Sequence, residues 1–129
     1  MAQKSILIVD DDPEFLQEMQ ETLRLSGYKV DSLDRANSVV DHAAKNPPDL
    51  ILLDLKMSGM TGFEVIKGLR GSPRTAQIPI IAMSGYFSEQ KDCTLFDFFQ
   101  IKQCLQKPFH PLDVISHIES TLKDADISI

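Results

Sequence analysis

The sequence predicts an α/β fold, in which helices cover both faces of a parallel sheet. Short unbroken apolar runs, such as 6–9 and 50–53, are too short for helices and are typical of strands buried on both faces. Longer stretches with apolar residues at helical spacing lie between these runs. Strand and helix alternate five times, and short right-handed connections then place all five strands parallel in one sheet.

The first strand and helix are defined by residues on both sides of their junction. The strand at 6–9 is followed by Pro13, which suits the first position of a helix, and Asp12 precedes it as an N-cap. Apolar residues at helical spacing continue to Leu23, and Gly27 is a typical helix stop. We therefore expect a helix from Pro13 to just before Gly27.

The next elements lead to the central strand. A short strand at 28–30 and a helix at 36–43 come first, and Pro47–Pro48 must end that helix. The apolar run 50–53 then ends in Asp54. A carboxylate in this position points into the crevice where open α/β sheets bind ligands.

The second half of the chain continues the alternation. Its glycines and prolines mark the element ends, and its last strand is the least apolar, as at the edge of a sheet. The expected elements are a helix from 61 or 62 through 69, a strand at 78–83, a helix from about 88–94 to 99, an edge strand at 102–106, and a last helix at 112–122 before a frayed tail at 124–129.

Composition limits the function classes. The 129 residues predict a single domain, 1–129, with a core from about 5 to 122. A net charge of −6 argues against direct binding of nucleic acid. No apolar run approaches the roughly 20 residues needed to cross a membrane, and the N-terminus does not resemble a secretory signal. Two cysteines make no disulfide framework, so we expect a cytoplasmic protein.

Several chemically active residues follow the predicted strands. Asp10 and Asp11 follow the first strand, Asp54 ends the third, Ser84 the fourth and Lys107 the fifth. Three carboxylates in one cleft repel each other unless a cation lies among them, and oxygen ligands suit Mg²⁺. A lysine and a hydroxyl could hold anionic oxygens. Together these groups are suited to accept a phosphoryl group, since such transfer needs positioning and charge neutralisation.

Each of these residues also has a simpler interpretation. The triple aspartate at 10–12 could only cap a helix and complement its dipole. Lys107 could be a solvated turn residue, and Ser84 a turn former. These interpretations are reasonable one by one, but together they require five residues to fall on one edge of the sheet by chance.

The motifs resemble the receiver domain of bacterial two-component response regulators, of the chemotaxis-regulator type. The resemblance covers about 5–122, and it implies a flavodoxin-like fold with strand order 2-1-3-4-5, an order documented for this family. The matching segments are ILIVDDDP at 6–13, LILLDLKMSGMTG at 50–62, MSG at 83–85 and KPF at 107–109.

The resemblance also implies roles for individual residues. Asp54 would take phosphate from a histidine on a partner kinase or phosphotransfer protein. Asp11, Asp54 and the main-chain carbonyl of Lys56 would bind Mg²⁺ directly, and Asp10 through water. The phosphoryl oxygens would be contacted by Ser84 and Lys107.

By the same resemblance the chain is a phosphoacceptor signalling domain rather than an enzyme. Phosphorylation would switch a surface that binds a downstream target protein, with no direct contact with nucleic acid or membrane. The face made by the fourth helix, fifth strand and fifth helix would also allow a homodimer.

Four residues, in three places, depart from the family pattern. Ser58 stands where a proline is usual, and Gln100–Ile101 where Gly-Ala is common. Cys104 stands at the position of the switch aromatic, so the usual coupling between Ser84 and the output face lacks its ring. All residues of the acidic pocket are present.

Two other functions fit parts of the sequence. A haloacid-dehalogenase-type phosphatase would use Asp10 as nucleophile and Asp12 as acid/base. It also needs a later acidic pair, where this chain has only Asp113. A receiver-like binding module that signals without phosphate would be consistent with the altered fifth strand.

Overall fold

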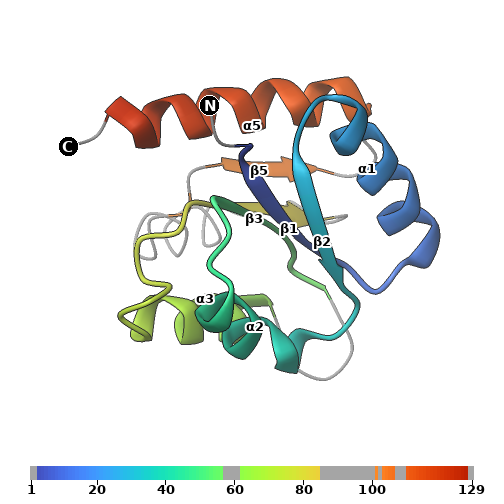
Figure 1. Ribbon diagram of the computed structural model, residues 1–129. Coiled ribbons are helices and arrows are strands. Elements are labelled where there is room, and N and C mark those ends of the chain that lie inside the picture. Colours follow the sequence, from blue (N-terminus) through green and yellow to red (C-terminus); the bar gives the residue numbers. More distant parts are fainter. Residues whose placement is uncertain (1–2, 57–61, 85–100, 102, 107–109, 128–129) are drawn as a thin grey trace.

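A computed structural model shows a five-stranded, fully parallel sheet with helices on both faces (Figure 1). The structure describes residues 3–56, 62–84, 101, 103–106 and 110–127. The strand order β2-β1-β3-β4-β5 confirms the expected fold. The elements are β1 (Ser5–Val9), α1 (Pro13–Leu25), β2 (Lys29–Leu33), the 3₁₀ turn η1 (Ala36–Ser38), α2 (Val39–Lys45), β3 (Leu50–Asp54), α3 (Gly62–Gly71), β4 (Ile80–Ser84), β5 (Gln103–Gln106) and α5 (Pro111–Ile127).

Alternation along the strands divides the interior into two cores. Ile6 and Ile8 of β1 pack with α1 and α5, whereas Leu7 and Val9 pack with η1, α2 and α3. The same alternation runs through β3: Leu50 and Leu52 belong to the core beside α1 and α5, whereas Ile51 and Leu53 belong to the core beside α2 and α3. Figure 1 shows α1 and α5 on one face of the sheet and α2 and α3 on the other.

The ends of α1 are as the sequence predicts. The Asp12 carboxylate accepts hydrogen bonds from the backbone N–H groups of Glu14 (3.0 Å) and Phe15 (3.4 Å), and Pro13 is the first helical residue. Gly27 adopts a left-handed φ of +99° just beyond the helix, a conformation that favours glycine.

Several element boundaries differ from the expectation. β2 extends to Leu33, the helix expected at 36–43 divides into η1 and α2, and α3 ends at Gly71. β4 begins at Ile80 rather than at residue 78, because Pro79 has no N–H to donate and the N–H of Ile78 bonds the carbonyl of Thr75 instead. α5 continues through Ile127, where the sequence predicted a frayed tail from residue 124. The segment 123–127 contains no glycine or proline that would stop a helix. The helix expected between 88 and 99 lies outside the described residues.

Among the described residues, no helix has both the length and the apolar composition that crossing a membrane requires.

Candidate functional site

Two buried aspartates lie side by side at the carboxyl ends of the central strands. Val9 of β1 pairs with Leu53 of β3, so Asp10 and Asp54, the next residues, are neighbours. Asp10 is 1% exposed and Asp54 5%. With the exposed Asp11, they form a cluster in which one carboxylate oxygen of each residue lies within 4.8 Å of the others. The convergence predicted for these three residues is therefore present.

Each buried aspartate makes the same local turn. One oxygen of Asp10, Oδ1, accepts a hydrogen bond from the N–H of Asp12 at 2.9 Å. Oδ1 of Asp54 accepts one from the N–H of Lys56 at 3.0 Å. Aspartates that bond the backbone two residues ahead stabilise tight turns, and here the turns orient both carboxylates at the sheet edge. These bonds are not among the features predicted from the sequence, although an Asp at the end of a strand is the signal for them.

The start of α3 packs tightly against the end of β3. The N–H of Gly62 donates to the carbonyl of Leu55 at 3.1 Å. A Cβ at position 62 would lie 2.5 Å from the Leu55 Cα, closer than real Cβ contacts. The sequence predicts only that the helix starts at residue 61 or 62. The structure shows that glycine is needed for the close backbone approach beside Asp54.

The chemistry of the cluster fits a divalent cation. Carboxylates this close repel each other unless a cation neutralises them. Octahedral Mg²⁺ binds oxygens at 2.0–2.1 Å, which places its ligand atoms within about 4.2 Å of each other. Oxygens within 4.8 Å of one another are thus close to this spacing, with small adjustments or a bridging water. Within the described part of the chain, this is the only group of three or more His, Cys, Asp or Glu side chains that could hold a metal ion.

The backbone brings the ends of the remaining strands to the same edge. Asp54 pairs with Met83, and Ser84 pairs with Gln106. Lys107 follows Gln106 in the sequence but lies outside the described residues, as does the side chain of Ser84.

Cys104 lies in β5 opposite Ala82, and it is partly buried. The next residue, Leu105, packs into the core beneath α1 and α5. Because neighbouring strand residues face opposite sides, Cys104 belongs to the other face of the sheet. A small thiol therefore occupies the position at which the resemblance to receiver domains predicts an aromatic ring.

Comparisons with known proteins agree on one family. A family model described as the response regulator receiver domain matches residues 6–119. The transcriptional regulatory protein BaeR of Escherichia coli is 30% identical over 118 residues, which are 92% of this chain and 48% of BaeR. The chain spans about a fifth to a half of the length of such curated relatives.

Solved structures show the same fold. The chemotaxis protein CheY4 of Vibrio cholerae matches with a TM-score of 0.86 and 27% identity, over 93% of this chain and 99% of CheY4. The receiver domain of the sensor histidine kinase PA1611 from Pseudomonas aeruginosa has a TM-score of 0.83 and 24% identity, over 95% of this chain and 99% of that one. That structure is described as having a magnesium ion coordinated in the active site cleft.

Proposed function

The chain belongs to the response regulator receiver domains of two-component systems, and we propose that it is a Mg²⁺-dependent phosphoacceptor with Asp54 as the acceptor. The observation that carries this proposal is the position of Asp54. It is buried at the end of β3, with carboxylates of Asp10 and Asp11 within 4.8 Å. A carboxylate on a rigid strand, beside a cation site, is well placed to act as a nucleophile.

The cation would be held by oxygen ligands at the carboxyl edge. We assign Asp11, Asp54 and the main-chain carbonyl of Lys56 to direct binding, and Asp10 to binding through water. The acidic cluster and the magnesium ion in the PA1611 receiver support this assignment. When bound, Mg²⁺ would neutralise the carboxylates and the charge of the incoming phosphoryl group.

In the transfer itself, a carboxylate oxygen of Asp54 attacks phosphorus as the bond from phosphorus to the donor histidine breaks. The histidine keeps the bonding electrons and takes up a proton, and Asp54 becomes an acyl phosphate. Lys107 and Ser84 would hold the phosphoryl oxygens, one as a cation and the other through its hydroxyl. The register of Ser84 with Gln106 supports their approach to one edge of the sheet.

Receiver domains work with histidine kinases and downstream effectors, and we propose both kinds of partner for this chain. Phosphate on Asp54 adds negative charge that biases an equilibrium between two conformations, which present different surfaces. One surface would bind a target protein or a second copy through the fourth helix, β5 and α5. With Cys104 at the aromatic position, the signal would reach that face without the usual ring. These steps take place in the cytoplasm.

The phosphatase interpretation is not favoured. Its acid/base would be Asp12, but the Asp12 carboxylate caps α1 and accepts hydrogen bonds from two backbone N–H groups. The group is therefore committed to helix stability. The third interpretation, signalling without phosphate, makes the opposite prediction in the experiment below.

The test is labelling with a small phosphodonor in the presence of Mg²⁺. Wild type should form an acyl phosphate, Asp54→Asn should not, and Asp41→Asn, a matched change of an exposed aspartate on α2, should label normally. Equal labelling of Asp54→Asn would refute the assignment. A wild type that neither binds Mg²⁺ nor accepts phosphate would favour the phosphate-independent module. Steady ester hydrolysis that depends on Asp12 would favour the phosphatase.

A further inference from the structure

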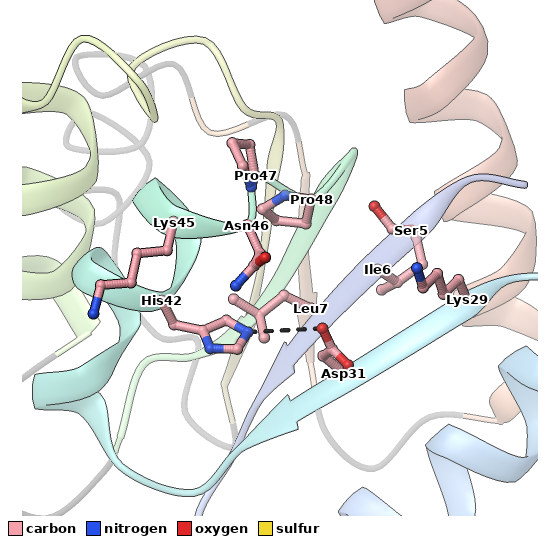
Figure 2. Close-up of a pocket in the computed structure, with 10 residues that line it drawn as sticks. All are labelled: Ser5, Ile6, Leu7, Lys29, Asp31, His42, Lys45, Asn46, Pro47 and Pro48. Atoms are coloured by element: carbon pink, nitrogen blue, oxygen red, sulfur yellow. Dashed lines mark ion pairs between the residues drawn. The ribbon is translucent and has the colours of Figure 1, made fainter. Parts of the chain in front are cut away.

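A hollow lies at the opposite end of the sheet from the acidic cluster. It is formed between α2 and the first residues of β1 and β2, and Figure 2 shows the side chains around it. Its volume is about 340 Å³, within the range of sites that bind small molecules. α2 ends at Lys45, and the chain turns away through Pro47 and Pro48, so the helix leaves this part of the sheet face open.

The hollow gathers positive charge in an acidic protein. Lys29 of β2 and Lys45 of α2 both line it, and neither has an ion-pair partner among the described residues. Asp31 is the only carboxylate in the described lining. The chain as a whole carries a net charge of −6, whereas the lining residues of the hollow carry two ammonium groups against one carboxylate.

His42 adds a polar group that lacks a hydrogen bond. Its Nε2 atom is shielded from solvent and has no hydrogen-bond partner, and it lies 3.7 Å from the carboxylate oxygen Oδ2 of Asp31 (Figure 2). Buried polar atoms are rarely left in this state, because the missing hydrogen bond costs free energy. The Asp31 side chain is 63% exposed, so it can turn into solvent and leave its place beside Nε2 to another anionic oxygen.

We propose that this hollow binds a small organic anion, a carboxylate or a phosphate-type group on an apolar body. The anionic oxygens would take the place of Asp31 beside His42 and attract Lys29 and Lys45. The apolar body would lie against Leu7 on the floor and Pro47 on the wall. Lys45 extends away from the strands in Figure 2, and its flexible stem allows it to turn toward the ligand. The proposal does not depend on phosphate transfer at Asp54.

The experiment maps binding by amide chemical shifts in ¹⁵N-labelled protein, without added divalent cations. The probes are benzoate and phenylphosphonate, with benzyl alcohol as a neutral counterpart. We expect saturable shifts at Lys29, Asp31 and His42, and no effect of benzyl alcohol. Saturation by only one anion would identify its chemical class. Equal binding of benzyl alcohol, shifts confined to the acidic edge, or no saturable shift would refute the proposal.

Substitutions test the charges one at a time. Lys29→Gln and Lys45→Gln should each weaken binding about fivefold, as expected for losing one exposed charge near an anion. Asp31→Ala should tighten it by a similar factor. Lys67→Gln on α3, an exposed lysine outside the hollow, is the matched control and should bind as wild type. All four changes are at exposed positions, and circular dichroism verifies the fold. Unchanged affinity in both Lys29→Gln and Lys45→Gln, or weaker binding by Asp31→Ala, would refute the proposal.

Discussion

Asp10 and Asp54 lie side by side at the ends of neighbouring strands. Each accepts a hydrogen bond from the backbone N–H of the residue two positions ahead, at 2.9 Å for Asp10 and 3.0 Å for Asp54. Two buried carboxylates are thus held next to each other by the same local geometry. The two negative charges repel each other, and a bound cation would make their proximity favourable. The unliganded domain is therefore expected to be strained at this edge and stabilised by Mg²⁺.

The first prediction concerns Asp11, the exposed member of the acidic cluster. Asp11→Asn should weaken Mg²⁺ binding by at least about tenfold, since even indirect partners of a metal contribute that much. Without metal the same change should leave stability unchanged or raise it by about 1 kcal/mol, because one repulsion is removed. Urea unfolding with and without Mg²⁺ measures both effects. If Mg²⁺ stabilises the variant as much as wild type, Asp11 is not a ligand.

The second prediction separates capping from chemistry at Asp12. Asp12→Ala should lower the free energy of unfolding by about 1 kcal/mol, because two N–H groups at the start of α1 lose their acceptor. Asp12→Ser should recover most of that loss. Both variants should still accept phosphate from a small donor at the wild-type level. Loss of phosphate acceptance in the folded Asp12→Ser variant would contradict a purely capping role.

The third prediction concerns the close approach of α3 to β3. Gly62→Ala should destabilise the domain by about 1–3 kcal/mol, since the new Cβ would clash with the Leu55 backbone. Gly71→Ala, at the other end of the same helix, meets nothing within 4 Å and should be neutral or slightly stabilising. Thermal or urea unfolding of the pair tests this directly. Equal stability of the two variants would mean that the junction adjusts without cost.

The fourth prediction concerns ionisation of Tyr28. Burial, and then the negative charge of Glu119, raise the pKa of Tyr28 above its ordinary value of 10.0. The unfolded chain therefore loses this proton first, and Tyr28 makes the folded state less stable as the pH rises above 10. Absorbance titration of a Tyr86→Phe background should show the raised pKa. Adding Glu119→Gln should lower that pKa but leave it raised, because burial is the larger cause; a Tyr28 pKa at or below 10.0 would contradict this.

Much of the fold could be predicted because its signals are local. The apolar runs at 6–9 and 50–53 each form a strand buried on both faces, and Asp12 and Pro13 begin a helix as expected. The end of α5 was missed because nothing between 123 and 127 distinguishes a frayed tail from a continuing helix.

The acidic cluster could be predicted because parallel strands bring their carboxyl ends together, whatever the sequence distance between them. The tight contact at Gly62 could not, since it depends on where the chain returns to β3. The hollow beside His42 also escaped prediction. Its charges come from β2 and α2, and only the packed structure places Lys29, Asp31 and Lys45 around one space.

The position of β3 in the middle of the sheet determines how slowly its backbone should exchange with solvent. β3 is hydrogen-bonded to β1 on one edge and β4 on the other, and all five of its residues are buried. Its amide protons should therefore exchange with solvent only when the entire domain opens. Asp54 is the last residue of a strand that should be among the last parts of the domain to unfold. Any rearrangement that begins at its carboxylate should therefore occur in the segments that connect the strands.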